Sequence, residues 1–258
     1  MSWPDFPLAF YPVAVFAILL TGIAKGGFGG GSGGVAVPLM SIFIAPPEAA
    51  AIMLPILCAM DLFGVHAYRG LASRTHLAIL LPGALVGIVA GAFAFGAMPV
   101  DAIRLVVGGI AIAFALNRWF AVSERIAARL AAGSGTPGPV AGAFWGAVSG
   151  FTSTLAHAGG PPFAVYLLPQ KLDKSAFVAT SVFFFLIVNY VKLVPYGFLG
   201  QLNLGNLSAS LLFAPLAPLG IWLGVWLHRR IPEAPFYQVA YGLLFATGAK
   251  LVWDALVH

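Results

Sequence analysis

The chain has 258 residues, of which 60% are hydrophobic and 8% are charged, and its formal net charge is +5. A soluble domain has about 25% charged residues and could not cover its surface with so few, whereas lipid tails accept an apolar exterior. The basic residues are few and lie between apolar runs, which is typical of membrane loops and excludes a nucleic-acid patch. The single cysteine, Cys58, rules out an intrachain disulfide, and no His, Cys and Asp cluster has metal-ligand spacing, so we expect no metal and no other cofactor.

From the N-terminus, the chain consists of two broken apolar stretches, each followed by three long apolar runs. A helix needs about 20 apolar residues to cross the hydrocarbon core, and each long run meets that length. The stretches 8–45 and 138–168 are interrupted at 26–34 and 149–162 by glycine-rich segments, so we predict pairs of short helices that meet at irregular backbone. No basic region precedes the first stretch, which we expect to belong to the mature protein. The predicted spans are 48–68, 75–97, 101–119, 174–196, 205–228 and 234–256.

The two halves of the sequence match each other when one is shifted along the other. A shift of 133 residues aligns five Gly and Pro positions in order within corresponding spans, including Pro82 with Pro215 and Gly87 with Gly220. We therefore predict a tandem repeat, with residues 1–130 as the first repeat, 131–138 as a linker and 139–258 as the second repeat. Pairs in the broken stretches are Gly33 with Gly159 and Gly34 with Gly160 at a shift of 126, and Gly22 with Gly146 and Gly26 with Gly150 at a shift of 124.

The orientation of the spans follows from the basic residues, which favour the cytoplasmic side. If each broken stretch enters and leaves on one face, nine Lys and Arg residues fall on the same side. Three crossings then remain in each half, so the halves insert in opposite orientations and both termini are extracytoplasmic. We predict an all-α polytopic membrane protein of two inverted repeats, each a broken, re-entrant helical hairpin plus three transmembrane helices. The nine residues are Arg69, Arg74, Arg118, Arg125, Arg129, Lys171, Lys174, Arg229 and Arg230.

Two motifs resemble a known family. The run 22–31 (GIAKGGFGGG), followed by Val37-Pro38-Leu39, and the second-half segment 159–162 (GGPP) are similar to the TauE/SafE sulfite-exporter family, also called the 4-toluene sulfonate uptake permease family. The resemblance covers essentially the whole chain. It implies a transporter of sulfite or a related small organosulfur anion and not an enzyme, and we expect it in the bacterial inner (plasma) membrane with its basic loops cytoplasmic.

Inverted repeats with broken helices at mid-depth are a common design of secondary transporters that work by alternating access. A negative-inside membrane potential favours exit of an anion by about 2.3 kcal/mol per charge per 100 mV, so export is the expected direction. The partners that we expect are the sulfur-containing anion and the lipid bilayer, with no nucleic acid, and the oligomeric state stays open.

The glycine-rich breaks are the predicted substrate path, because polar backbone at membrane depth is tolerated where protein or a water-filled cavity covers it. Short helices that begin near Val35 and Pro162 would present free N–H groups and a partial positive charge, which suit an oxyanion. Alternatively, the glycines merely allow close helix packing. The predicted substrate-binding residues of the breaks are Gly33, Gly34, Gly159 and Gly160, with the hydroxyl groups of Ser32, Thr152, Ser153 and Thr154.

Two ionisable residues at the breaks complete this set. Lys25 precedes the first break, and an ionisable group at membrane depth is a functional candidate that would add positive charge to an anion path. It could instead snorkel to an interface or pair with a buried carboxylate. His157 in the second break could donate to an oxyanion or relay a proton near neutral pH, or serve a structural role.

Four further polar residues lie in the first long span of each half. Asp61 and His66 belong to 48–68, and Asn189 and Lys192 belong to 174–196, where their spacing of three places them on one helix face. His66 and Lys192 correspond at the shift of 126, and two cations related in this way would line the anion pathway or sense protons. Alternatively, Asp61 and Lys192 neutralise each other across the bundle.

Two other kinds of function stay open on the sequence. An intramembrane enzyme would use Ser153, His157 and Asp61 as a triad, although no nucleophile-elbow motif surrounds them. A non-transporting membrane subunit would need no substrate site at all. No Walker A motif occurs, so we do not expect direct ATP drive.

Overall fold

The computed structural model describes residues 6–27, 33–134, 136–228, 230 and 233–257. Over these residues the secondary structure is helical, without strands, and six segments are long and apolar enough to cross a membrane. The prediction of an all-α polytopic membrane protein is confirmed.

Five of the six spans are continuous helices whose bounds follow the predicted runs closely. Local signals set their starts: α3 begins on two prolines, which fit a first turn because its N–H groups have no helical partner. The carboxylate of Asp173 caps α9 by accepting the N–H of Ala176 at 3.0 Å. These helices are α3 (Pro46–Ala67), α4 (Arg74–Ala97), α5 (Val100–Phe120), α9 (Lys174–Phe198) and α12 (Glu233–Val257).

The remaining span, predicted as one helix over 205–228, is divided into α10 (Leu204–Phe213) and α11 (Leu216–His228). Pro215 lies at the division, where it has no N–H to donate and its ring obstructs the preceding turn. The chain instead closes a short turn, with the N–H of Ala217 donating to the carbonyl of Ala214 at 3.0 Å. The segment as a whole is long enough to span a membrane, as predicted, and the turn at Ala214 and Pro215 is an addition from the structure.

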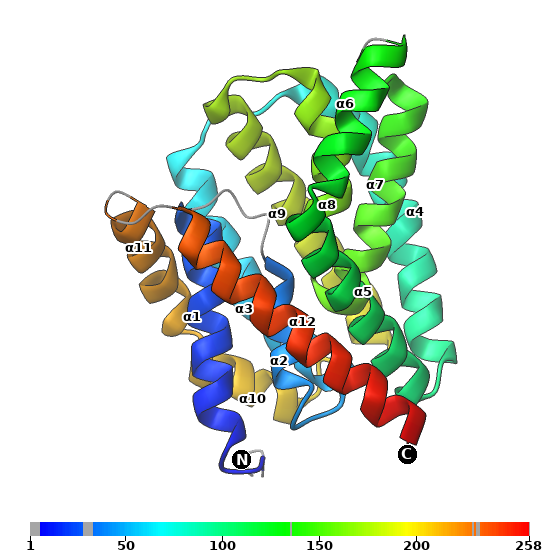
Figure 1. Ribbon diagram of the computed structural model, residues 1–258. Helices are drawn as coiled ribbons and strands as arrows, with labels where there is room; N and C mark the ends of the chain where they lie inside the picture. Colours follow the sequence, from blue (N-terminus) through cyan, green and yellow to red (C-terminus); the bar gives the residue numbers. More distant parts are fainter. Residues whose placement is uncertain (1–5, 28–32, 135, 229, 231–232, 258) are drawn as a thin grey trace.

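Each half starts with short helices, as the broken stretches predict. The first set is α1 (Phe10–Gly27), the 3-10 turn η1 (Gly33–Val35) and α2 (Ala36–Met40); the second is α7 (Pro139–Ala156), α8 (Gly160–Leu167) and the 3-10 turn η2 (Leu168–Gln170). Figure 1 shows α1 starting at the end of the bundle where both termini lie and α2 leading back to it, whereas α7 and α8 start from and return to the opposite end.

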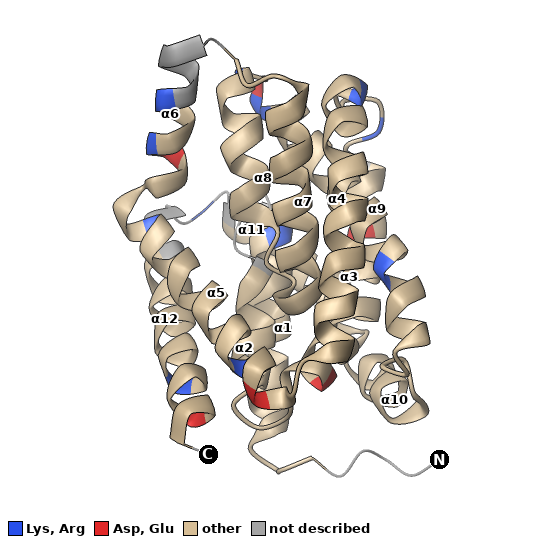
Figure 2. Cartoon of the chain, turned by 90° about the vertical axis from the view of Figure 1, so that its right-hand side faces the viewer, with Lys and Arg blue, Asp and Glu red and all other residues tan. Residues whose placement is uncertain are grey.

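The link between the halves is largely helical. The amphipathic helix α6 (Val122–Ser134) extends into the predicted linker 131–138, and α7 begins directly after it at Pro139. Figure 2 shows basic residues on α6 and on the loops at the end of the bundle away from the termini. The topology prediction places the basic residues together on the cytoplasmic side of the membrane, and basic residues do lie at this end of the bundle.

Helices of one half pack along helices of the other. The long interfaces are α7 against α4, α1 against α11, and α5 against α12, while α3 and α9 lie together between them. A methyl group at Gly87 would overlap the backbone of Ala147, and one at Gly26 would overlap the backbone of Ile221. Glycine at such positions lets two helix backbones approach closely. The first helix of each half is therefore held by the middle span of the other half.

The two breaks meet near the middle of the bundle. Gly34, which follows the first break, packs against Ala158 of the second break so closely that a Cβ at position 34 would lie 2.7 Å from the Ala158 Cβ. Residues 28–32 of the first break lie outside the described residues. The meeting point is covered by α3 and α9, and it is here that the polar side chains of the interior gather.

Candidate functional site

The first polar cluster joins three elements and consists of Lys25, Asp61 and Asn189, here called the ion-pair cluster. Lys25 of α1 contacts Asp61 of α3 at 2.5 Å between Nζ and Oδ1, and Asn189 of α9 donates from Nδ2 to the other carboxylate oxygen at 2.6 Å. Asp61 is 1% exposed. Both carboxylate oxygens thus have partners, as a charge removed from water requires.

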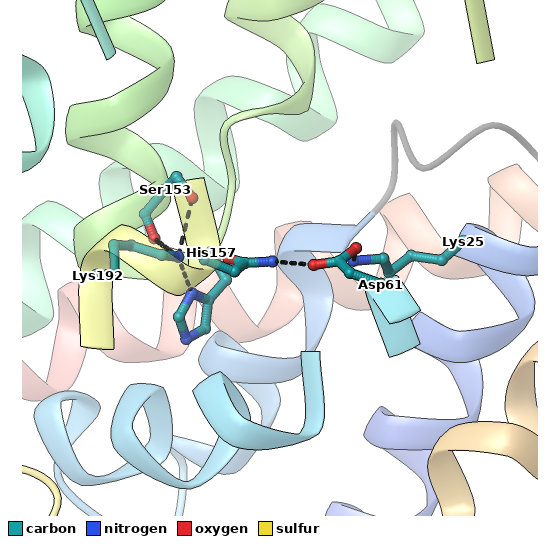
Figure 3. A network of polar contacts seen from close by, with 6 residues as sticks. Lys25, Asp61, Ser153, His157 and Lys192 are labelled. Atoms are coloured by element: carbon teal, nitrogen blue, oxygen red, sulfur yellow. Dashed lines mark hydrogen bonds and ion pairs between the residues drawn. The ribbon is translucent and has the colours of Figure 1, made fainter. Parts of the chain in front are cut away.

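The second cluster surrounds Lys192 of α9, with Ser153 and His157 from the end of α7, and is here called the Lys192 cluster. The ammonium lies 3.0 Å from the carbonyl oxygen of Ser153, 3.0 Å from its Oγ and 2.7 Å from Nδ1 of His157. These three contacts use the three donors of the ammonium. Lys192 is fully buried, and the groups that it contacts in the described structure are all neutral acceptors. Figure 3 shows the two clusters facing each other.

His157 is held in a backbone conformation that favours glycine. It ends α7 with φ of 52°, in the left-handed region, and its N–H donates to the carbonyl of Ser153 at 3.0 Å. Its ring spans the two halves: Nδ1 accepts from Lys192, so Nε2 carries the proton and donates to the carbonyl of Ala50 on α3 at 2.8 Å. A left-handed residue with a bulky side chain is retained where that side chain is needed.

A cavity lies between the clusters, with an empty volume of about 540 Å³ including its open mouth. Its polar lining comes from both clusters, from Ser181 of α9 and from Gly160 at the N-terminus of α8. Its apolar lining comes from Leu57 of α3 and from Val182 and Phe185 of α9. The lining residues are Lys25, Leu57, Asp61, Ser153, His157, Gly160, Ser181, Val182, Phe185 and Asn189.

With both lysines protonated, the charges around the cavity do not cancel. Two ammonium groups, of Lys25 and Lys192, surround one carboxylate, of Asp61, and this carboxylate is already paired with Lys25. The excess of one positive charge lies in a protein interior, where an uncompensated charge is unfavourable and where Coulomb attraction is stronger than in water. A bound monoanion would complete the balance, so the site is suited to a small anion.

Several residues predicted from the sequence come together here, and others do not. Lys25, Asp61, Ser153, His157, Gly160 and Asn189 line the cavity, and Lys192 lies directly behind it. Lys25, and not Lys192, is the ion-pair partner of Asp61, so the alternative in which Asp61 and Lys192 neutralise each other is wrong. His66 is exposed on the last turn of α3, and its predicted correspondence with Lys192 does not bring the two together.

The remaining predicted groups make contacts within the protein. Thr152 and Thr154 donate to the carbonyls of Val148 and Gly150, one turn earlier in α7, at 2.9 and 2.8 Å. Gly159 packs against Ser149, whose hydroxyl donates to its carbonyl at 2.7 Å. Gly34 contacts Ala158, Gly33 begins η1, and Ser32 lies outside the described residues. The helix after the first break, α2, has five residues, too short for the N-terminal anion site that we predicted near Val35.

Sequence reasoning found Asn189 of α9 but missed Ser181, Val182 and Phe185, which also form the cavity wall. Ser181, Phe185 and Asn189 are spaced by four residues and therefore lie on one helix face. The spacing of four residues from Asn189 is the sequence signal that points to Phe185 and Ser181.

The comparisons with known proteins agree with this architecture. The family model described as "Sulfite exporter TauE/SafE" matches residues 14–251. No curated protein and no solved structure matches the chain. Members of the matched family are membrane transporters, so the prediction that the protein is not an enzyme is confirmed. With nearly its whole length matched and six helices able to span a membrane, the chain belongs to the TauE/SafE sulfite exporter family.

Proposed function

We propose that the protein is a secondary transporter that exports sulfite or a related small organosulfur anion through the cavity between its two clusters. The observation that carries this proposal is the excess positive charge at a buried cavity where the two breaks meet. Backbone and hydroxyl donors from the second break add hydrogen-bonding capacity for an oxyanion. The apolar wall of the cavity accommodates an organic substituent on the sulfur atom.

Alternating access would arise from movement of one half against the other. We take residues 1–130 and 139–258 as inverted repeats joined by the linker 131–138; the exchanged packing of α1 on α11 and α7 on α4 supports this assignment. Two hydrogen bonds cross between the halves at the site, from Asn189 to Asp61 and from His157 to the carbonyl of Ala50. A rocking motion must break or remake both hydrogen bonds. The contacts that change between the two access states would therefore lie next to the bound anion.

In the ion pair between Lys25 and Asp61, the lysine can exchange the carboxylate for a bound anion. When an anion enters, it competes with Asp61 for the ammonium of Lys25, and the freed carboxylate keeps its bond from Asn189. The ammonium of Lys192 stays in place, because its three donors are used within the protein. Lys25 therefore acts as the mobile contact, and Lys192, when protonated, adds positive potential from a fixed position behind the cavity.

We place the protein in the bacterial inner membrane with the basic end of the bundle in the cytoplasm and both termini outside. The basic residues on α6 and its neighbouring loops support this orientation under the positive-inside rule. The inside-negative membrane potential drives the anion outward.

The test is flux of defined anions by purified protein in liposomes. Vesicles loaded with sulfite, thiosulfate, sulfoacetate or a simple sulfonate are expected to release at least one of them faster than protein-free vesicles, and an inside-negative potential should accelerate release. A folded protein that moves none of them would contradict the proposal and favour a non-transporting membrane subunit.

A further inference from the structure

Ser181 on α9 differs from the other buried hydroxyl residues that the structure describes. It is 5% exposed and lines the cavity, yet its Oγ has no hydrogen-bond partner among the described residues. Elsewhere in the described interior, buried Ser and Thr hydroxyls have partners, commonly the carbonyl one turn earlier. Thr180, the preceding residue, donates to the carbonyl of Ala176 at 2.6 Å. A buried hydroxyl without a partner is destabilising, so its presence requires an explanation.

Ser181 lies on a face of α9 that packs near the start of α8. Ser181 lies one turn before Phe185 on the same face of α9, and a Cβ at Gly159 would lie 2.9 Å from the Phe185 ring. This face of α9 therefore lies against the segment from which α8 begins. Ser181 and Gly160, the first residue of α8, both line the cavity.

The N-terminus of α8 has few N–H groups to offer. Gly160 is followed by Pro161 and Pro162, which have none, and the N–H of Phe163 already donates to the carbonyl of Gly159 at 3.2 Å. In the first turn of α8, the N–H of Gly160 is thus the donor left for a ligand in the cavity. It carries the partial positive charge of a helix start.

We propose that the Ser181 hydroxyl and the Gly160 N–H form an oxyanion subsite that binds oxygen atoms of the transported anion. This inference rests on the proposed function and assigns Ser181 as a residue that determines specificity. The positive potential of Lys192 and Lys25 attracts any small anion, whereas oriented donors distinguish an oxyanion from a halide of equal charge. Ser153 also lines the cavity, and its Oγ accepts from Lys192 and keeps its own proton.

The test compares equilibrium binding of sulfite and of chloride to purified wild-type protein and to Ser181→Ala. Loss of one hydrogen bond to a charged ligand is expected to raise the Kd for sulfite about tenfold, with a smaller effect on chloride. Ser181→Cys, which is close in volume but a weaker donor, is expected to lose affinity for sulfite in the same direction and by less. Neither variant should melt at a lower temperature than the ligand-free wild type.

Ser210→Ala is the matched control. The Ser210 hydroxyl is equally buried but donates to the carbonyl of Ile52 at 2.8 Å and contacts the carbonyl of Asn206 at 2.9 Å, away from the cavity. This control should lower the melting temperature and leave the Kd for sulfite unchanged. An unchanged sulfite Kd in Ser181→Ala, or an equal loss for sulfite and chloride, would overturn the inference alone. Wild-type protein that neither binds nor transports any sulfur oxyanion would overturn the proposed function and this inference with it.

Discussion

The two lysines of the candidate site have opposite surroundings. Lys25 is 14% exposed and contacts a carboxylate, whereas Lys192 is fully buried and contacts a hydroxyl, a carbonyl and an imidazole nitrogen. Lys25 lies on a helix next to a break, and Lys192 lies within a full span. The first ammonium is neutralised and can change partners, while the second keeps its charge unbalanced. An anion site needs both, because a fully neutralised site attracts no anion and a rigid one does not release it.

The largest effect is expected from removing the unbalanced charge. Lys192→Met keeps the length of the side chain and should lower sulfite flux by about 100-fold, since a fully buried charge that serves a bound anion is worth about 3 kcal/mol. Flux in liposomes measures it. Lys250→Met, which removes an exposed lysine paired with Asp254, is the control and should leave flux unchanged. Equal flux in both variants would show that Lys192 is not the source of the attraction.

Removing the partner of the other lysine should separate binding from transport. Asp61→Asn leaves Lys25 without its counter-charge, which raises the positive charge around the cavity from one to two. We expect tighter sulfite binding together with slower flux, because the anion no longer has a competitor for Lys25. We also expect a lower melting temperature, since breaking a buried ion pair costs about 3–5 kcal/mol. Weaker binding in this variant would contradict the exchange of partners.

The helix contacts that carry the clusters can be tested with a pair of glycines. Gly87→Ala places a methyl group on the backbone of Ala147 in α7 and should destabilise the protein by about 1–3 kcal/mol, as overpacking does. Gly109→Ala is the control, because nothing lies within 4 Å of a Cβ at that exposed position on α5. Thermal unfolding in detergent compares the two. A Gly87→Ala protein as stable as the control would show that this close approach is not required.

The smallest effect is expected from a hydroxyl that already has a partner. Thr152 donates to the carbonyl of Val148 in its own helix, so Thr152→Val should change sulfite flux by less than about twofold. A clear loss of flux would restore Thr152 as a substrate ligand, which was the prediction from its place in the second break.

Much of the fold could be predicted from the sequence, because the length of an apolar run is a local property. The predicted run 75–97 became α4 (Arg74–Ala97), and the breaks occurred where glycine and proline gather. Pro215 was the exception. Its counterpart Pro82 lies within the continuous helix α4, whereas Pro215 separates α10 from α11. Proline at aligned positions of the two halves therefore interrupts one helix and not the other. Proline at a given position thus does not by itself predict whether a helix continues or ends.

Composition and pattern alone predicted an integral membrane protein. They also predicted two glycine-rich breaks and ionisable residues within the membrane-spanning part of the chain. The tertiary structure decided which of those residues meet. It paired Asp61 with Lys25 and Asn189, left His66 exposed, and brought the unselected Ser181 to the cavity. The physical reason is that insertion of a segment in the membrane depends on its average polarity. Which side chains contact each other depends on how each helix is rotated about its axis and on how closely two helices approach. Those are set by glycine contacts between α4 and α7 and between α1 and α11, more than 50 residues apart in the sequence.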